Sequence, residues 1–270
     1  MAGVRLTASG LALGYAAGPV ITGVDLSLAP GDRVAFVGAS GTGKTTLLHG
    51  LAGLLAPQSG EVAADGAVVA SPGGPCTSRH AAYMFQRPLL LPWKTARENA
   101  ALAATVARPA PDRHATSPIE RWALAQAEEH LVEFGLGDFL DAYPHELSGG
   151  MCQRVALART LILGRGLVLL DEPFASLDVL TRGDLQVWLR EVMDRHPATW
   201  VLVTHDIREA VLLADRVAVL GGRPAGITGW VETAGDAAQA VAESEGLLRA
   251  TVTGGAAPRV GATHTRRPVL

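Results

Sequence analysis

The sequence has few lysines and no surplus of positive charge. Its 270 residues include 23 lysines and arginines against 26 aspartates and glutamates, which gives a formal net charge of −3. Nucleic-acid binders normally carry a basic surplus or a basic stripe, and neither is visible here, so we expect no nucleic-acid partner. Lys44 and Lys94 are the only lysines. A lysine that falls inside a motif is therefore hard to attribute to background composition.

Cysteines and long apolar runs are also scarce. Cys76 and Cys152 lie far apart and fit neither a metal site nor a disulfide framework, which indicates a reducing compartment. The first ten residues lack the charged and then apolar pattern of a signal peptide. No uninterrupted apolar run approaches membrane-spanning length. We therefore expect a cytosolic protein that would serve a membrane only from outside the bilayer.

The apolar pattern predicts an α/β fold with a mostly parallel sheet. Residues 1–30 alternate apolar and polar positions, as expected of an N-terminal antiparallel β subdomain. A continuous apolar run at 33–37 is typical of a strand buried on both faces, and 61–69 predicts a hairpin around Asp65-Gly66. Downstream, apolar strands alternate with helices, which favours a parallel sheet. The strands are expected at 167–170, 201–204 and 217–220, and the helices near 184–194 and 207–214.

A helical pattern interrupts this alternation between about 95 and 142. Its two segments flank a proline-rich loop (ARPAPDRHATSP), and we interpret them as part of a helical subdomain over about 88–165. We expect 1–232 to form one domain, and the residues 233–270, which are rich in Ala, Gly and Thr, to form a flexible tail.

A glycine-rich segment follows the strand predicted at 33–37 and precedes a helix. It matches the P-loop pattern, which cradles phosphates with backbone N–H groups and the positive end of a helix. Lys44 would reach the terminal phosphates, and the Thr45 hydroxyl would coordinate Mg²⁺. An ordinary glycine-rich turn would not require Lys and Thr at these offsets. The predicted nucleotide-binding residues here are Gly38, Ala39, Ser40, Gly41, Thr42, Gly43, Lys44, Thr45 and Thr46.

Two acidic residues end the strand predicted at 167–170. Asp171 is placed to hold Mg²⁺ through water, and Glu172 to polarise an attacking water as a general base. The alternative is that two exposed acids simply end a strand. The strand is strongly apolar and Pro173 stops it at once, so we favour the catalytic interpretation.

His205 ends the strand predicted at 201–204. A single histidine is more often structural than catalytic, but ligands of such sheets bind outside the carboxyl ends of the strands. The P-loop, the two acids and His205 all fall at such ends. We therefore expect His205 near the γ-phosphate, where it would donate a hydrogen bond to developing charge.

A second possible anion site lies at 147–154 (LSGGMCQR), where a helix is predicted to begin. Ser148 suits an N-cap, and Gly149 and Gly150 expose the backbone of the first turn, which is where helices bind anions. Taken alone, this segment favours a capped helix without a ligand, because a fold with one P-loop seldom needs a second γ-phosphate binder.

Together, these motifs resemble the nucleotide-binding subunits of ABC transporters over about residues 4–228. The family pattern is also matched by Tyr15 as the adenine-stacking aromatic, by Gln86, by LSGGM at 147–151 and by the D-loop 176–178 (Ser-Leu-Asp). The resemblance implies the ABC ATPase fold, with ATP and Mg²⁺ as ligands, and Gln86 as a link between the metal, the attacking water and a partner groove. Met151 stands where the family most often has Gln, which we expect to change only the polarity of the helix's first turn. The further ATP contacts that the resemblance implies are Tyr15, Ser148, Gly149, Gly150 and Asp178.

The same resemblance implies a partner. Two subunits of this family meet head to tail, and the signature of one, here Ser148 with Gly149 and Gly150, closes over the P-loop nucleotide of the other. Both sites are then equivalent by two-fold symmetry. Hydrolysis removes the γ-phosphate that bridges the halves, so the pair opens. A second copy of the chain is therefore the expected user of the second anion site.

The stretch QRPLLLPWKTARENA at 86–100 looks like the subunits that power uptake of nitrate, taurine and alkyl sulfonates. This resemblance implies a permease whose coupling helix enters a groove beside Gln86, an extracytoplasmic solute-binding protein, and a peripheral position on the cytoplasmic face of the membrane. Residues 89–91 and Trp93 form an apolar cluster that suits a partner, unless the leucines face the core. An importer of a thiamine precursor or another organic anion stays open, because the ATPase subunit does not contact the cargo.

Two other classes of function compete with transport as explanations of the motifs. Soluble ABC ATPases of DNA repair or translation usually carry two modules or a long coiled coil, and this chain has one module and no heptad run. A P-loop kinase of small molecules would not need LSGGM or His205, and it would need a lid and an acceptor site. We therefore favour an ATPase that drives a separate permease.

Overall fold

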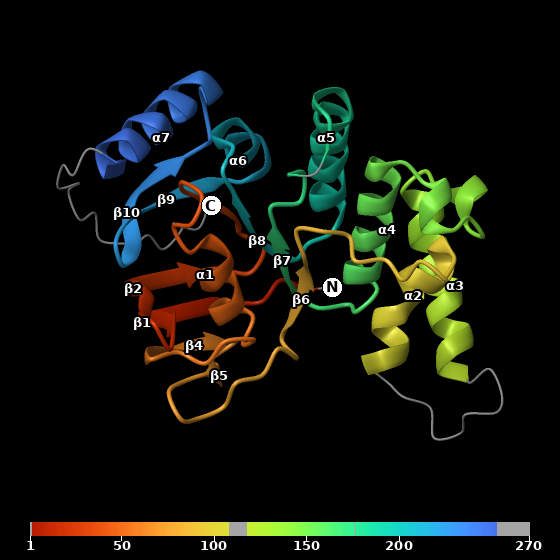
Figure 1. The fold of residues 1–270 in the computed structure, drawn as a ribbon, viewed down its shortest axis with the longest axis horizontal. Coiled ribbons are helices and arrows are strands. Elements are labelled where there is room, and N and C mark those ends of the chain that lie inside the picture. The colour runs from red at the N-terminus through yellow and green to blue at the C-terminus, as the bar shows by residue number, and fades with distance from the viewer. Residues whose placement is uncertain (1, 108–117, 176, 253–270) are drawn as a thin grey trace, which may run out of the picture.

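A computed structural model describes residues 2–107, 118–175 and 177–252, and within them one mixed sheet of ten strands forms the centre of the molecule (Figure 1). The strand order across the sheet is β5-β4-β1-β2-β10-β9-β3-β8-β7-β6. The strands are β1 (Leu6–Tyr15), β2 (Gly18–Leu28), β3 (Arg33–Val37), β4 (Ser59–Ala64), β5 (Ala67–Ala70), β6 (Ala81–Met84), β7 (Leu167–Asp171), β8 (Thr199–Thr204), β9 (Arg216–Gly222) and β10 (Ala225–Glu232).

Helices cover both faces of this sheet. They are α1 (Lys44–Leu51), α2 (Ala96–Ala107), α3 (Pro118–Glu133), α4 (Gly149–Leu161), α5 (Val179–Arg195), α6 (Ile207–Leu213) and α7 (Ala237–Val252), with short 3₁₀ turns η1 (Gly137–Phe139) and η2 (Pro144–Glu146). No helix in the described ranges combines the length and the apolar character needed to cross a bilayer.

The sheet has a parallel and an antiparallel part. Strands β6, β7, β8, β3 and β9 pair in parallel, while β1, β2, β4 and β5 pair antiparallel. Strand β10 joins the two parts, because it runs antiparallel to β9 and parallel to β2. This arrangement confirms the predicted α/β fold, including the N-terminal antiparallel subdomain and the hairpin around Asp65-Gly66.

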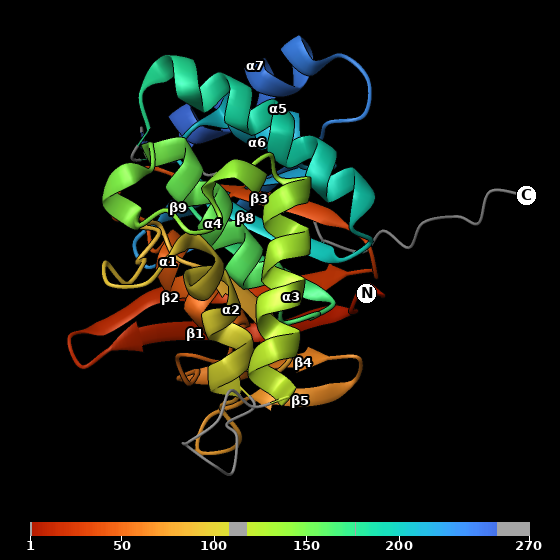
Figure 2. The same ribbon diagram turned by 90° about the vertical axis from the view of Figure 1, so that its right-hand side faces the viewer.

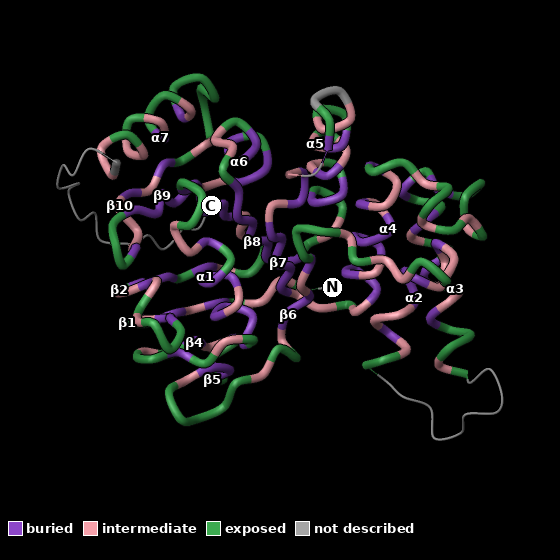
Figure 3. The backbone as a smooth tube through the Cα atoms, viewed as in Figure 1, coloured by how far each residue is buried: buried purple, intermediate pink, exposed green. Residues whose placement is uncertain are grey.

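Two apolar cores lie on the two faces of the sheet, and β3 contributes to both. Val34 and Phe36 belong to the core that includes α1, whereas Ala35 and Val37 belong to the core that includes α4, α5 and α6. Successive residues of a strand point to opposite faces, so a strand covered on both sides needs a continuous apolar run. Figure 3 shows the buried residues concentrated along the strands.

Helices α2, α3 and α4 pack on one another in a helical lobe beside the sheet (Figures 1 and 2). Arg97 on α2 pairs with Glu128 on α3 at 3.2 Å and also with Asp141, which ties the lobe together. These helices fall within the predicted helical subdomain. Most of the proline-rich loop, at 108–117, lies outside the described residues.

Helix α7 corrects the expectation of a flexible tail from residue 233. It packs against β9, β10 and α6, and its Ala240 is buried. The approach is close: a Cβ on Gly221 would lie 2.3 Å from the Thr251 side chain, and one on Gly229 would lie 2.8 Å from Leu247. Glycine at both positions therefore lets the helix reach the strands. Residues 253–270 lie outside the described part of the chain.

Candidate active site

Three neighbouring strands bring the predicted site residues to one edge of the sheet. Strand β3 leads into the P-loop, β7 ends at Asp171, and β8 is followed by His205. The parallel register pairs Val37 with Thr204 and Asp171 with Val203, so the carboxyl ends of the three strands lie level. Ligands of open α/β sheets bind at such ends. The topology therefore brings together three segments that are far apart in the sequence.

The P-loop, residues 38–45, has a backbone that requires glycine. Gly41 and Gly43 have φ of 77° and 98°, and a Cβ on Gly43 would lie 2.6 Å from the Val20 side chain. Helix α1 begins at Lys44, and its first-turn N–H groups have no partners within the helix. The loop and the helix N-terminus together fit an anion, as the sequence pattern predicts.

Lys44, Glu172 and His205 form one connected line across the strand ends. The Lys44 ammonium lies 3.4 Å from Glu172 Oε1, and His205 Nδ1 lies 3.0 Å from Glu172 Oε2. Lys44 is only 5% exposed, and its Nζ also donates to the carbonyl oxygens of Gly38 (2.9 Å) and Ala39 (3.3 Å). The cation and the imidazole thus each contact the carboxylate that lies between them.

Glu172 adopts an uncommon backbone conformation. Its φ is 42°, in the left-handed region that non-glycine residues rarely adopt, and its N–H donates to the Val203 carbonyl at 2.9 Å. Such a conformation costs on the order of 1 kcal/mol and is typical of functional sites. The conformation points to a role for this side chain beyond packing.

Asp171 receives one hydroxyl hydrogen bond on each carboxylate oxygen. Thr45 Oγ1 donates to Oδ1 at 3.0 Å, and the Tyr83 hydroxyl donates to Oδ2 at 2.9 Å. Burial raises the pKa of Asp171, and the two hydrogen bonds offset only part of that rise. Burial and the charge of Asp171 also raise the pKa of Tyr83, so its hydroxyl stays a donor. Tyr83 was not predicted as a site residue, because it belongs to none of the sequence motifs.

The Thr45 and Asp171 pair suits Mg²⁺ by its chemistry. Mg²⁺ prefers oxygen ligands and is commonly held by one or two carboxylates, with phosphates and water completing its shell. Within the described residues, no cluster of three or more His, Cys, Asp or Glu is arranged to hold a metal. Thr45 and Asp171 therefore fit a magnesium ion whose other ligands come from phosphates and water.

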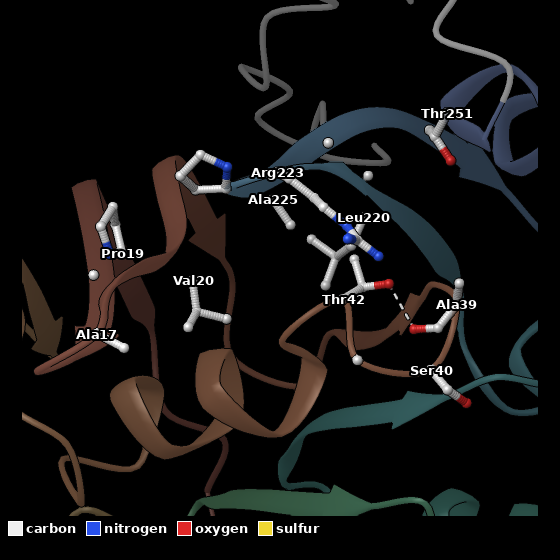
Figure 4. Close-up of a pocket in the computed structure, with 15 residues that line it drawn as sticks. Ala17, Pro19, Val20, Ala39, Ser40, Thr42, Leu220, Arg223, Ala225 and Thr251 are labelled. Atoms are coloured by element: carbon white, nitrogen blue, oxygen red, sulfur yellow. Dashed lines mark hydrogen bonds between the residues drawn. The ribbon is translucent and has the colours of Figure 1, made fainter.

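A cavity of about 1180 Å³ opens beside the P-loop (Figure 4). It is lined by Ala17–Val20 after β1, Ala39–Thr42 of the P-loop, Leu220–Ala225 of the β9–β10 hairpin, and Thr251. Arg223 is the one charged residue of this described lining, and in Figure 4 its side chain points toward Thr42. Arg223 lies in no motif, so sequence reasoning missed it. Tyr15, the predicted adenine-stacking residue, ends β1 two residues before the lining residue Ala17 and is 53% exposed.

Gln86 lies just past β6, the edge strand next to β7, and its side chain is exposed. Met84 pairs in parallel with Leu170, so the chain leaves β6 at the same edge where Asp171 ends β7. Its predicted contact with the metal and the attacking water stays a prediction.

The signature segment lies in the helical lobe rather than over the P-loop of its own chain. Ser148 caps α4, since its Oγ accepts a hydrogen bond from the Met151 N–H at 3.2 Å. Figure 1 shows α4 in the helical lobe and α1 on the other side of β6 and β7. The structure thus confirms the predicted cap but does not bring Ser148, Gly149 and Gly150 to the nucleotide-binding edge.

The D-loop follows β7 at the start of α5. Asp178 accepts a hydrogen bond from the Thr181 N–H at 3.0 Å, which stabilises the first turn of that helix. Ser176 lies outside the described residues. The predicted contact of Asp178 with ATP stays a prediction.

The loop between Gln86 and α2 exposes two large apolar side chains. Leu89 is 56% and Trp93 is 69% exposed, whereas Leu90 packs partly against the core. The predicted apolar cluster is therefore open to a partner at Leu89 and Trp93, and Leu90 is corrected to a core contact. Large exposed apolar side chains that lie close together often mark an interaction site.

One end of this loop is held by Asn99, the only asparagine in the chain. Asn99 is fully buried, and its Nδ2 donates to the carbonyl oxygens of Leu91 (3.1 Å), Lys94 (2.9 Å) and Thr95 (3.1 Å). Its Oδ1 accepts from the Leu91 N–H at 2.7 Å. All the polar atoms of this side chain are therefore used.

The other end is held by Arg159 on α4. Its guanidinium donates to the carbonyl oxygens of Leu89 (3.0 Å) and Pro88 (2.5 Å), and burial lowers its pKa. Sequence reasoning named neither Asn99 nor Arg159, because the loop that they hold is defined only by the fold.

Comparisons with known proteins agree with this architecture. Residues 21–175 match the family described as ABC transporter. The chain is 45% identical over 205 residues to the aliphatic sulfonates import ATP-binding protein SsuB 1 of Xanthomonas axonopodis pv. citri (strain 306), covering 76% of each chain. It is also 45% identical to the nitrate import ATP-binding protein NrtC of Synechococcus elongatus, of which it spans 30%. A dimeric structure of a post-hydrolysis state of the ATP-binding cassette MJ0796 bound to ADP and Pi matches 86% of this chain with a TM-score of 0.69 at 27% identity.

Proposed function

Because the chain belongs to the ABC transporter family, we propose that it binds ATP with Mg²⁺ and hydrolyses it to power an importer. The observation that carries the proposal is the line of Lys44, Glu172 and His205 at the open end of the P-loop. Transfer of a phosphoryl group to water needs a cation that binds the phosphates, a carboxylate that accepts a proton from the water, and a donor to the charge that develops on the γ-phosphate. Lys44, Glu172 and His205 offer these groups in that order.

The contacts between Lys44, Glu172 and His205 suggest how ATP binding would activate Glu172 as a base. The phosphates would draw Lys44 away from Glu172, which frees the carboxylate to accept a proton from the attacking water. The water oxygen then bonds to the γ-phosphorus, the bond to the bridging oxygen breaks, and ADP and phosphate form. His205 would donate a hydrogen bond to the γ-phosphate oxygens, where charge develops. A bound Mg²⁺ would neutralise phosphate charge, and Thr45, Asp171 and Gln86 are the residues proposed to hold it.

The position of the signature supports a head-to-tail pair of chains. Ser148 caps α4 in the helical lobe, away from the P-loop of its own chain, and the related ATP-binding cassette is described as dimeric. We propose that Ser148, Gly149 and Gly150 of one copy close over the nucleotide of the other, with Asp178 near the same contact and Tyr15 against the adenine. The cycle of closing and opening would follow the γ-phosphate.

The relatives support transport of a small anion. Their names refer to import of aliphatic sulfonates, nitrate and bicarbonate. We propose a permease partner that docks on Leu89 and Trp93, an extracytoplasmic solute-binding protein, and a peripheral position on the cytoplasmic face of the membrane. We further propose that 1–232 works as one ATPase domain whose helical subdomain spans about 88–165.

A trapped dimer tests the hydrolysis and assembly parts of this proposal. Glu172→Gln keeps the phosphate-binding groups but removes the base, so it should bind ATP and elute as a dimer in size-exclusion chromatography. The control is Lys44→Ala combined with Glu172→Gln, which should elute as a monomer with ATP. A Glu172→Gln chain that stays monomeric at high concentration with ATP would contradict the head-to-tail pair.

Mixing two inactive variants tests the shared site directly. Lys44→Ala removes the P-loop cation of one copy, and Ser148→Arg blocks the signature of the other. Each alone should be inactive, but a mixed dimer holds one site in which both halves are intact. Phosphate release should therefore reappear on mixing, and no recovery would contradict a site built from two copies.

A further inference from the structure

Tyr83 is a half-buried residue that contacts Asp171, the carboxylate proposed to hold the metal, and none of the sequence motifs includes it. It lies on β6, opposite Leu169 of β7, and its hydroxyl donates to Asp171 Oδ2 at 2.9 Å. Thr45 takes the other oxygen, Oδ1, at 3.0 Å. The two hydroxyls therefore hold the carboxylate from both sides.

The Tyr83 ring is itself fixed by aromatic neighbours. Its centroid lies 4.7 Å from that of Phe85 and 5.5 Å from that of His49, which is on α1. Aromatic rings at such separations attract one another and restrict rotation. The hydroxyl is thus presented to Asp171 from a ring that contacts two aromatic neighbours.

A second hydrogen bond matters because the end of an aspartate side chain turns easily. Rotation of the carboxylate about the Cβ–Cγ bond has a broad, roughly two-fold preference, so one hydrogen bond leaves a range of orientations. With both oxygens bonded, that range narrows to the orientation in which Oδ1 stays beside Thr45, the other proposed metal-binding residue.

We propose that Tyr83 is a positioning residue that fixes Asp171 for the Mg²⁺ of the bound nucleotide. This inference rests on the proposed function, because it assumes that Thr45 and Asp171 hold a metal together with phosphates. Tyr83 does not touch nucleotide or metal and acts through Asp171. Strand β6 would then contribute to the metal site in two ways. Tyr83 positions Asp171, and the chain continues three residues further to Gln86, another residue proposed to hold the metal.

Mn²⁺ binding to the full chain tests the proposal without reference to catalysis. Tyr83→Phe keeps the ring against Phe85 and His49 and removes only the hydroxyl. With ADP present, its Mn²⁺ affinity, measured from the free-ion signal in electron paramagnetic resonance, should fall on the order of tenfold, as for partners of other metal ligands. Affinity for a fluorescent ADP analogue in EDTA should stay within about twofold of the unmodified chain. The matched control is Tyr143→Phe, at a tyrosine near η2 in the helical lobe, which should leave both affinities unchanged.

A double-mutant cycle shows whether Tyr83 acts through Asp171. In an Asp171→Asn background, Tyr83→Phe should cause less than about a twofold further loss of Mn²⁺ affinity. A full further loss in that background would overturn the proposal, as would an unchanged Mn²⁺ affinity in the single variant. An equal loss of ADP affinity in EDTA would also overturn it, because Tyr83 would then support the whole site. If the unmodified chain binds no ADP analogue, the proposed function fails and this inference fails with it.

Discussion

The nucleotide edge of the sheet and the loop 87–95 use buried polar groups in opposite ways. At the edge, Lys44 contacts Glu172 and two loop carbonyls, and arriving phosphates would compete for that cation. At the loop, Asn99 of α2 uses its oxygen and its nitrogen on the loop backbone, where no ligand competes. We infer that the edge is built to exchange partners, whereas the loop is built to keep its shape.

The two regions also differ in the side chains that they expose to solvent, which are polar at the edge and apolar in the loop. Half of the His205 side chain is open to solvent at the edge, while the loop exposes Leu89 and Trp93. A polar group in solvent suits a charged ligand that comes and goes, and an apolar group on a rigid loop suits a protein surface. Substitutions at the edge should therefore harm function more than stability, and those in the loop's supports should do the reverse.

The largest effect is expected at Lys44. Lys44→Ala should lower phosphate release at least on the order of a hundredfold, because Lys44 is the only lysine of the P-loop. The matched control is Lys94→Ala at the chain's other lysine, which pairs with Glu98 at 3.7 Å in the loop. The control should hydrolyse ATP normally. Near-normal hydrolysis by Lys44→Ala would overturn the P-loop assignment.

A substitution at Asn99 should lower stability and leave nucleotide binding unchanged. Asn99→Leu removes four hydrogen bonds from a buried side chain and leaves loop carbonyls unpaired, which should lower the free energy of unfolding by about 2–3 kcal/mol. Urea denaturation measures this change, and nucleotide affinity of the folded fraction should not move. Gln126→Leu on the surface of α3 is the control, with a change within about 0.5 kcal/mol. A stable Asn99→Leu protein that has lost nucleotide affinity would break the contrast between the regions.

The docking surface should separate partner binding from ATP binding. Trp93→Ala with Leu89→Ala should weaken capture of the permease on the order of tenfold, since truncating an aromatic anchor typically costs more than 1 kcal/mol. Nucleotide affinity should not change. Val187→Ala on α5, where the side chain is 55% exposed, is the matched control. Unchanged capture by the double variant would place the permease elsewhere.

The sequence predicted the nucleotide edge better than the loop, and the reason is physical. Phosphate chemistry restricts residue types at fixed offsets, so Lys44, Asp171 and His205 were identifiable before the fold was known. Tyr83 and Asn99 act only where β6 meets β7 and where a loop folds over α2, and no spacing in the sequence expresses such contacts. Helix α7 was missed because it lies in 233–270, a stretch whose richness in Ala, Gly and Thr resembles that of a tail, although β9 and β10 offer the helix a surface to pack on.

The last expected effect is on the pH dependence of stability, and it concerns Glu209, a buried acid close in sequence to His205. Glu209 lies on α6, shortly after His205, is 4% exposed, and has no hydrogen-bond partner for its Oε1 among the described residues. Burial, together with the charge of Asp206, raises its pKa from 4.5 to about 8. Between those two pH values the folded chain binds more protons than the unfolded chain, so this residue makes stability fall as pH rises.

Glu209→Gln removes that titration while keeping the shape of the protonated acid. Its free energy of unfolding should match that of the unmodified chain below about pH 4, exceed it increasingly up to about pH 8, and then stay several kcal/mol higher, on the order of 1.4 kcal/mol for each unit by which the pKa is raised. Thermal unfolding at pH 5.5 and pH 8.5 measures the difference, and Glu191→Gln on the exposed face of α5 should show none. If Glu209→Gln and the unmodified chain were equally stable at each of the two pH values, the acid would be well solvated. The nucleotide edge would then carry no buried charge that costs stability, and the contrast with the fully bonded Asn99 would be confined to Lys44 and its partners.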